Sequence, residues 1–213
     1  MTCLIAGASG LVGGELLNIL LSDNHFTKII SLGRKQLPIE NEKLAQIITP
    51  LDKVEAFILP ASDVAFCCLG TTIHKAGSQE NFKLVDHEYV LRFARAAKKA
   101  GVKKFLLVSS LGADANSNIF YSKVKGDVEN DLKSMKFESL LIFQPSLLLG
   151  ERAEQRTLEK MAIISAPLLN PFLIGPLAKY KPIAASTVAA SMAKKSLESN
   201  SGSQIISNQE MLK

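Results

Sequence analysis

The chain has 213 residues, of which 47% are apolar and 21% charged, so it is long enough to form one domain around a sizeable core. Its net charge of +5 comes from scattered lysines and arginines without interleaved aromatic residues, and no nucleic-acid recognition motif accompanies them. We therefore expect a solvated basic surface and no nucleic-acid partner. Since no apolar run approaches the roughly 20 residues that cross a bilayer, we also expect no membrane span.

The cysteines and histidines show no spacing typical of a metal site. Cys3, Cys67 and Cys68 form an odd set, which is typical of a reducing compartment. The first predicted strand begins at residue 2, so we expect no leader segment and a cytoplasmic protein. His25 and His87 have no evident partners in the sequence, and we expect both at the surface.

Short apolar runs alternate with segments of helical periodicity. Nearly continuous apolar strands separated by helices indicate a parallel sheet covered on both faces, and we predict a doubly wound α/β fold. Ligands bind such sheets outside the carboxyl ends of the strands. The predicted strands are 2–6, 28–32, 45–48, 63–69, 104–110 and 140–144, and the predicted helices are 11–21, 81–100 and 121–135. In the second helix, the predicted apolar face comprises Phe82, Val85, Tyr89, Phe93 and Ala97.

The chain after about residue 150 has a different character, with short, broken helical segments and the prolines Pro167, Pro171, Pro176 and Pro182. Proline interrupts helices and central strands. We therefore predict a single domain over residues 1–213, in which residues 150–190 form a lid or substrate-binding extension.

A glycine-rich turn, Gly7-Ala8-Ser9-Gly10-Leu11-Val12-Gly13, lies between the first predicted strand and the first predicted helix. In dinucleotide-binding turns the first glycine permits the tight turn, the second the approach of a pyrophosphate, and the third close packing of helix on strand. Gly7, Gly10 and Gly13 fit these roles, and the helix start would offer free N–H groups to the phosphates. The turn predicts a nucleotide cofactor, and the alternative is a purely structural turn.

The segments after the second and fourth strands bear on which cofactor binds. An acidic residue after the second strand would bind the ribose 2′-hydroxyl of NAD, but this chain has Gly33-Arg34-Lys35. A guanidinium and an ammonium group suit a 2′-phosphate, so NADP(H) is favoured over NAD; the alternative is that both side chains only form a solvated loop. The fourth strand ends at Leu69-Gly70-Thr71, which we expect beside the cofactor.

Tyr121 and Lys125 are one turn apart in the third predicted helix, so both project from one face. An unperturbed phenol has a pKa near ~10, and a neighbouring ammonium group lowers it, which lets tyrosine exchange a proton with a substrate oxygen. A serine at the end of the fifth strand, Ser109 or Ser110, would orient that oxygen. The pattern predicts carbonyl or alcohol redox chemistry, and the alternative for the pair is an ordinary surface helix.

Longer motifs extend this pattern and carry a family resemblance. They are Phe-Cys-Cys-Leu-Gly-Thr-Thr (66–72), Lys75-Ala76-Gly77, Val85-Asp86, Tyr89-Val90-Leu91, Ser109-Ser110, Gly112-Ala113-Asp114 and Tyr121-x-x-Val124-Lys125-Gly126. Together with the glycine turn, they make residues 3–160 resemble the short-chain dehydrogenase/reductase superfamily, and more narrowly its atypical branch of Tat-interacting-protein-like oxidoreductases. The resemblance implies a Rossmann fold, NADP(H) and a Ser/Tyr/Lys active site.

Carried over to the matching positions, the resemblance implies Ser110, Tyr121 and Lys125 as catalytic residues, with Lys125 also holding the nicotinamide ribose. The second serine of the pair is active in typical members, although the spacing to tyrosine is shorter here than usual. With the residues named above, the predicted cofactor site comprises Gly7, Ser9, Gly10, Leu11, Val12, Gly13, Arg34, Lys35, Leu69, Gly70, Thr71, Tyr121 and Lys125.

Two positions depart from the family pattern. Thr49 stands where the third strand commonly ends in an acidic residue near the adenine. Gln144-Pro145-Ser146 replaces the Arg-Pro-Gly that commonly ends the sixth strand. Both departures affect the details of cofactor contact and leave the predicted fold unchanged.

Two functions remain open. The first is an NADP(H)-dependent oxidoreductase acting on a small carbonyl or alcohol, and the second is an NADPH-binding regulatory protein that acts on a protein partner with little or no turnover. The intact Ser/Tyr/Lys set favours the enzyme. A sugar-nucleotide epimerase is less favoured, because the region after residue 150 is short for a sugar-nucleotide pocket. Val124, Val128 and Leu132 form a stripe just wide enough to pack on the sheet, which favours a monomer.

Overall fold

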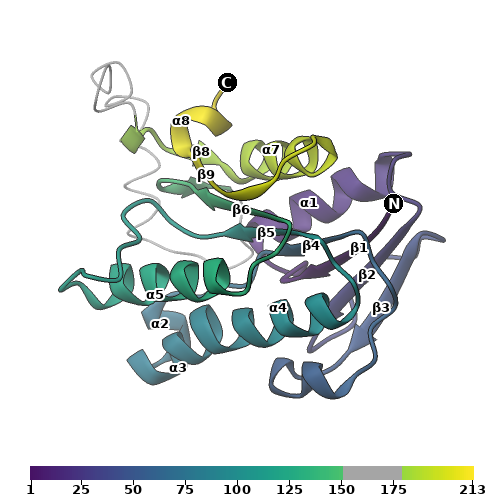
Figure 1. Ribbon diagram of the computed structural model, residues 1–213, viewed down its shortest axis with the longest axis horizontal. Coiled ribbons are helices and arrows are strands. Elements are labelled where there is room, and N and C mark those ends of the chain that lie inside the picture. The colour runs from purple at the N-terminus through teal and green to yellow at the C-terminus, as the bar shows by residue number, and fades with distance from the viewer. Residues whose placement is uncertain (151–178) are drawn as a thin grey trace.

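The computed structural model describes residues 1–150 and 179–213, which form a sheet of seven parallel strands with helices on both faces (Figure 1). A short second sheet pairs β7 (Leu148–Leu149) with β8 (Ile183–Ala184). The order of the large sheet reverses between β1 and β4, so the predicted doubly wound α/β fold is confirmed, with its switch point between these strands. In spatial order the strands are β3 (Leu44–Ile48), β2 (Lys28–Gly33), β1 (Thr2–Ala6), β4 (Val64–Cys67), β5 (Lys104–Val108), β6 (Ser139–Gln144) and β9 (Gly202–Ser207).

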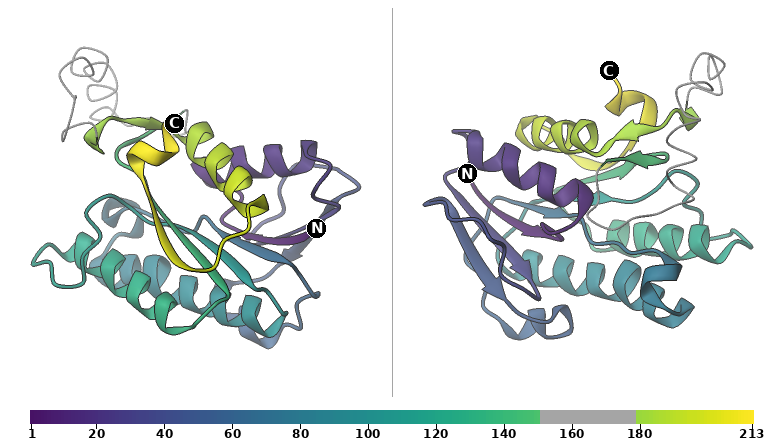
Figure 2. Two further views of the ribbon diagram at one scale, coloured as in Figure 1. Left: turned by 45° about the horizontal axis from the view of Figure 1, so that its top comes forward. Right: turned by 180° about the vertical axis from the view of Figure 1, so that it is seen from behind.

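Two helical layers enclose the sheet (Figures 1 and 2). On one face α1 (Leu11–Ser22) packs against α7 (Ala185–Leu197), while α4 (Tyr89–Lys99) and α5 (Phe120–Ser134) cover the other. An apolar core lies on each side of the sheet as a result. The shorter helices are the 3-10 helix η1 (Leu51–Ala56), α2 (Ile73–Ala76), α3 (Gln79–Lys83), the π-helix η2 (Leu84–Glu88) and α8 (Asn208–Met211).

All six predicted strands are present, and the structure adds a seventh to the large sheet. β9 lies at the edge of the sheet beside β6, and it was missed because Ile206 is its one buried residue. Pairing with β6, rather than an apolar pattern of its own, defines this strand. Residues 185–190 of the predicted extension form the first part of α7 in the core layer, and residues 151–178 of that extension lie outside the described residues.

The helix predicted at 81–100 is present as a continuous helical segment over residues 79–99, but a π turn interrupts its α-helical register. The chain forms α3, η2 and α4 in succession, with the short α2 before them. Asp86 and His87 are buried, whereas Val85 and Tyr89 of the predicted apolar face are only half-buried. A π turn accommodates one extra residue within a helix, and this changes which side chains face inward.

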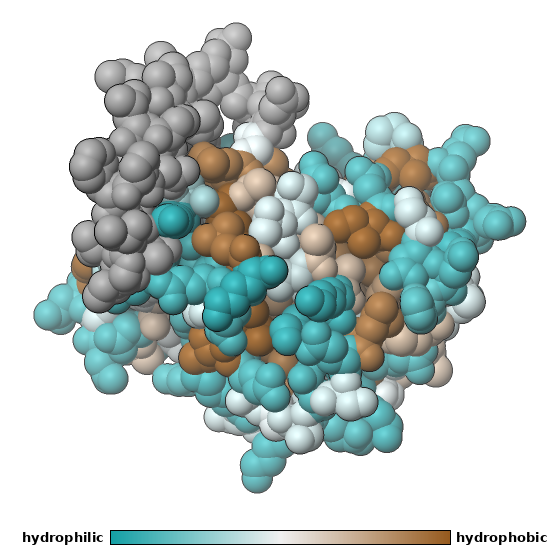
Figure 3. Space-filling model, turned by 90° about the horizontal axis from the view of Figure 1, so that it is seen from above, coloured by the Kyte–Doolittle hydropathy of each residue, from teal (hydrophilic) through white to brown (hydrophobic). Residues whose placement is uncertain are grey.

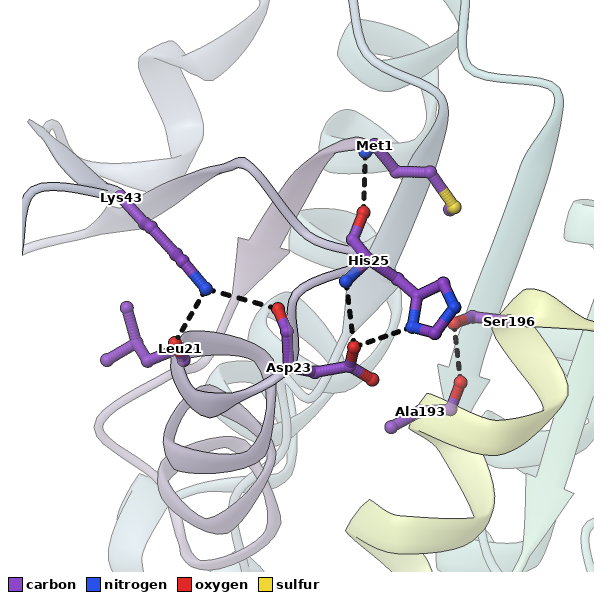
Figure 4. Close-up of polar contacts among 7 residues, drawn as sticks. All are labelled: Met1, Leu21, Asp23, His25, Lys43, Ala193 and Ser196. Atoms are coloured by element: carbon purple, nitrogen blue, oxygen red, sulfur yellow. Dashed lines mark hydrogen bonds and ion pairs between the residues drawn. The ribbon is translucent and has the colours of Figure 1, made fainter.

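The carboxyl end of α1 is held at the edge of the sheet opposite the glycine turn (Figure 4). Lys43 Nζ donates hydrogen bonds to the carbonyl oxygens of Leu21 (3.0 Å) and Asp23 (3.2 Å). His25 Nδ1 lies 2.7 Å from Asp23 Oδ1, and the Met1 ammonium group donates to the His25 carbonyl oxygen at 2.6 Å. His25 is exposed, as predicted, and it has a partner in Asp23 that was not evident from the sequence.

The outer surface above α1 and α7 has mixed polarity. Figure 3 shows apolar side chains in separate patches between hydrophilic ones on this face. Leu197 and Leu212 are among the exposed apolar residues of the C-terminal elements. Such a mixture is typical of a solvated protein surface.

Candidate active site

The glycine turn lies at the switch point, where the carboxyl ends of β1 and β4 are neighbours. Gly7 has a φ of 86°, and a Cβ on Gly7 would lie 2.4 Å from the Cys68 carbonyl oxygen. A Cβ on Gly13 would lie 2.1 Å from the Gly7 carbonyl oxygen, so α1 packs directly on the turn. Both positions exclude any side chain, which fits the turn and packing roles predicted for them.

The start of α1 carries the remaining residues predicted in this turn. Gly10 caps the helix, and its N–H donates to the Gly7 carbonyl oxygen at 2.9 Å. Ser9 and Gly10 are exposed, Leu11 is half-buried and Val12 is buried in the core. Gly10 makes no side-chain cap to α1, so among the described residues the first N–H groups of the helix are donors that suit a phosphate.

Arg34 and Lys35 follow β2 directly and are exposed at the same edge of the sheet. β2 pairs in parallel with β1, and Leu32 lies opposite Ala6, so the two cations stand beside the glycine turn. Neither side chain forms a hydrogen bond or an ion pair with another described residue. Two available cations beside such a turn suit a 2′-phosphate.

Lys125 lies beneath the loop that follows β4 and is buried, with 5% of the residue exposed. Its Nζ lies 2.7 Å from Asp86 Oδ1, and a Cβ on the exposed Gly70 would lie 3.9 Å from the same Nζ. Burial alone would lower the pKa of Lys125, but the Asp86 carboxylate and the neighbouring Tyr121 raise it above its ordinary value. The site therefore has a charged ammonium group directly under the β4 loop.

Tyr121 lies one turn before Lys125 on α5 and is half-buried. Its ring packs against Phe82 of α3, with 5.4 Å between ring centroids. The half-buried Leu69 and the exposed Gly70 precede Thr71, whose N–H donates to Asp86 Oδ2 at 2.8 Å. The buried Asp86 carboxylate thus joins Lys125 of the Tyr/Lys pair to the β4 loop.

The two serines after β5 differ in their surroundings. Ser109 is buried, and its Oγ lies 2.5 Å from Glu129 Oε1 on α5. The Oγ of Ser110 is also buried but has no hydrogen-bond partner among the described residues. An unpartnered buried hydroxyl at the carboxyl edge of the sheet is available to a substrate oxygen. This difference favours Ser110 as the active serine, which stays a prediction.

Gly126 explains how α5 is held at the site. A Cβ on Gly126 would lie 2.0 Å from the Ala115 backbone nitrogen, so the helix is pressed against the loop after Ser110. The Asp114 N–H donates to the Ser122 carbonyl oxygen at 3.0 Å across the same contact. The loop and the helix that carry Ser110 and Tyr121 therefore have a fixed relative position.

The two departures from the family pattern each have a local partner. Thr49 is buried, and its Oγ1 donates to the Pro50 carbonyl oxygen at 3.1 Å. Gln144 Nε2 donates to both carboxylate oxygens of Glu129, at 2.9 and 3.1 Å. Gln144 thus supports the buried acid that holds Ser109.

Asp86, His87 and Glu129 are buried polar residues near the site that the sequence analysis did not assign to it. His87 was expected at the surface without partners, but its Nε2 lies 2.9 Å from Asp131 Oδ2 on α5, so that expectation is wrong. Glu129 follows Lys125 by one helical turn, a spacing that could have indicated its place. Asp86 stood in the Val85-Asp86 motif, which had no assigned role.

A cavity of about 520 Å³ lies at the opposite edge of the sheet, near the amino ends of β4 and β5. Its lining includes Met1, Lys104 and Ser196, and Lys104 Nζ donates to the Ser196 carbonyl oxygen at 2.8 Å. The lining contains no residue of the predicted site. This cavity is therefore separate from the candidate active site.

The fold and this arrangement define a dinucleotide-binding protein with a Tyr/Lys pair at the carboxyl edge of its sheet. Residues 7–158 match the family described as NAD(P)H-binding, and the chain belongs to that family. It is 42% identical over 163 residues to "Protein HTATIP2" of Rattus norvegicus, and the match covers 74% of this chain and 67% of that protein. It is 38% identical over 153 residues to "Protein FMP52, mitochondrial" of Eremothecium gossypii, covering 71% and 68%. The predicted resemblance to the atypical short-chain dehydrogenase/reductase branch is confirmed.

Solved structures share the fold at low sequence identity. Human epimerase family protein SDR39U1 with NADPH has a TM-score of 0.66 and 17% identity, over 99% of this chain and 77% of that one. UDP-glucose 4-epimerase of Thermotoga maritima with UDP-glucose has a TM-score of 0.71 and 15% identity, over 97% and 77%. At such identity the similarity shows the fold alone.

Within residues 1–150 and 179–213, no helix has the length and apolar character needed to cross a membrane. Some relatives carry the word mitochondrial in their names. The predicted cytoplasmic location therefore stays a prediction.

Proposed function

We propose that the chain is an NADP(H)-dependent oxidoreductase of the atypical short-chain dehydrogenase type, acting on a small carbonyl or alcohol. The observation that carries the proposal is the buried Lys125 ammonium group beneath Gly70, one helical turn from Tyr121. Family membership supports the cofactor class. The glycine turn, in which no Cβ fits at Gly7 or Gly13, provides the close backbone approach that a pyrophosphate requires.

The residues of the site have distinct tasks in such a reaction. When bound, NADPH supplies a hydride to the carbonyl carbon of the substrate. Tyr121 donates its proton to the carbonyl oxygen, so that an alcohol forms, and the charged Lys125 stabilises the phenolate left behind. Ser110 donates a hydrogen bond that orients the oxygen before the proton moves.

The preference for NADP(H) over NAD rests on Arg34 and Lys35. Both are exposed beside the turn, and neither side chain forms a hydrogen bond or an ion pair with another described residue. A guanidinium group binds a phosphate through two parallel hydrogen bonds, whereas the 2′-hydroxyl of NAD offers it no charge.

The test is a fluorescence titration of the wild type and Arg34→Ala with NADPH and with NADH. We expect Arg34→Ala to raise the Kd for NADPH roughly tenfold to a hundredfold, because a charge-assisted hydrogen bond is lost, and to leave weak NADH binding unchanged. Arg95→Ala is the matched control, because Arg95 is exposed on α4 and pairs with Glu55 at 2.5 Å. Equal affinity of the wild type for both nucleotides would contradict the preference.

The second candidate function is an NADPH-binding regulatory protein that acts on a protein partner. It uses the same cofactor site, so cofactor binding does not separate the two candidates. Turnover does, because a regulatory protein has no need of the phenol of Tyr121. A screen of small aldehydes, ketones and alcohols, with Tyr121→Phe as the control, therefore decides between them.

A further inference from the structure

Asp86 has no part in the function proposed above, yet it is placed at the centre of the site. Its side chain is 0% exposed, and its Oδ1 lies 2.7 Å from Lys125 Nζ. Its Oδ2 accepts a hydrogen bond from the Thr71 N–H at 2.8 Å. A buried carboxylate is costly unless such partners surround it, so this position requires an explanation.

The π turn of η2 places Asp86 there. Two consecutive side chains of this turn face α5: Asp86 contacts Lys125, and His87 Nε2 lies 2.9 Å from Asp131 Oδ2. The extra residue of a π turn gives both neighbours access to one partner helix, and such turns recur at functional sites. η2 therefore holds α5 at two positions, of which Lys125 is one.

We propose that Asp86 is a positioning residue, which fixes the Lys125 ammonium group beneath Gly70 and, through the same carboxylate, holds the β4 loop. This inference rests on the proposed function, because it concerns the lysine and the loop that would meet the cofactor. The exposed Gly70 lies directly over the Lys125 ammonium group, since a Cβ on Gly70 would lie 3.9 Å from Nζ. The catalytic helix and the cofactor loop thus share one buried anchor.

Removal of the carboxylate changes the charge on Lys125 in a defined direction. Besides Asp86, the groups that act on Lys125 are Tyr121 on the same helix and the Cys67 thiol of β4. Burial raises the pKa of Cys67 to about 12, so this thiol stays neutral below about pH 9. Burial is the largest single influence on Lys125 and lowers its pKa, so without Asp86 we expect the lysine to lose its charge as pH rises.

The test is a fluorescence titration with NADPH at about pH 7 and about pH 9, using wild type, Asp86→Asn, Lys125→Met and the double variant. Asparagine keeps the size of the side chain and an acceptor for the Thr71 N–H, and it removes the charge. We expect Asp86→Asn to raise the Kd about tenfold at the higher pH and less at the lower one. In the absence of Lys125, the same substitution should change the Kd less than about twofold, because Asp86 then has no lysine to position.

The matched control is Asp131→Asn. It removes the charge from the His87–Asp131 contact between η2 and α5 without touching Lys125, and we expect wild-type affinity at both pH values. Melting curves by circular dichroism show whether each variant folds. If Asp86→Asn does not fold, Asp86→Glu replaces it: the charge is kept but displaced, and we expect weaker NADPH binding with no dependence on pH.

Several outcomes would overturn the inference. Equal weakening with and without Lys125 would assign Asp86 to the loop or to folding alone. Wild-type affinity in Asp86→Asn, or in Asp86→Glu where that variant is used, would show that the carboxylate does not position the lysine. If the wild type did not bind NADPH, the proposed function and this inference would both be overturned. The outcomes above differ from that case, because in them the wild type binds NADPH and only the role of Asp86 fails.

Discussion

Ser109 Oγ lies 2.5 Å from Glu129 Oε1, and this contact separates the roles of two adjacent serines. Glu129 is buried and also binds Gln144, so Ser109 belongs to a network that joins β5, α5 and β6. Ser110 Oγ has no partner in the described part of the chain. The end of β5 thus provides one serine for the structure and one for a ligand.

Alanine substitutions should separate these two serines. Ser109→Ala leaves Glu129 with one hydrogen-bond donor fewer in a buried position, so we expect the free energy of unfolding to fall by about 1–3 kcal/mol. Ser110→Ala should change stability by less than about 0.5 kcal/mol but lower turnover of a carbonyl substrate by about a hundredfold or more. Urea unfolding and steady-state rates measure the two effects. If Ser109→Ala lost turnover and Ser110→Ala lost stability instead, Ser109 would be the active serine.

Gly13 should tolerate no side chain. A Cβ there would lie 2.1 Å from the Gly7 carbonyl oxygen, and neither backbone can move without separating α1 from β1. We expect Gly13→Ala to cost about 3 kcal/mol or more and to abolish NADPH binding. Gly14→Ala is the control, because its Cβ would meet its nearest neighbour, the Ala8 carbonyl oxygen, at 3.6 Å. The control should be neutral or stabilising by up to about 1 kcal/mol, since alanine favours helix.

The fold and the core of the site depend on signals that short stretches of sequence contain. Apolar runs indicated the positions of six strands, the glycine spacing indicated the turn at Gly7, and a separation of four residues indicated the Tyr121/Lys125 pair. Each of these patterns is local and does not depend on tertiary contacts with the rest of the chain. They could therefore be found without the structure.

The parts that escaped prediction depend on tertiary contacts. β9 is a strand because it pairs with β6, not because its sequence alternates. Asp86 faces Lys125 because a π turn changes the register of the helix, while apolar periodicity favours an unbroken helix through residues 81–100. Similarly, Glu129 is identified only once Ser109 and Gln144 are seen to converge on it.

The buried cysteines should be unreactive in the native protein. Burial raises the pKa of Cys3 and of Cys67 to about 12, so both are protonated near pH 8. A thiol reagent at that pH should therefore label at most Cys68, the half-buried one, and should label all three cysteines after unfolding in urea. Rapid labelling of two or three thiols in the folded state would contradict the burial of these strands.

The same shift makes stability depend on pH. In the unfolded chain a cysteine thiol loses its proton near its ordinary pKa of 9.0, whereas in the native state Cys3 and Cys67 keep theirs. The free energy of unfolding should therefore fall as pH rises above about 9. Urea unfolding between about pH 7 and pH 10 measures the slope. Replacing Cys67 by alanine should reduce it, and an unchanged slope in that variant would assign the effect to other groups.

The most direct test of the proposed function is NADPH oxidation by wild type and Tyr121→Phe against a panel of small aldehydes and ketones. Phenylalanine keeps the ring contact with Phe82 and removes only the hydroxyl group. We expect the wild type to turn over at least one carbonyl class, and Tyr121→Phe to be slower by about a hundredfold or more with the Kd for NADPH unchanged within about twofold. Equal rates in both proteins would contradict Tyr121 as the proton donor, and no turnover by a wild type that binds NADPH tightly would favour the regulatory function.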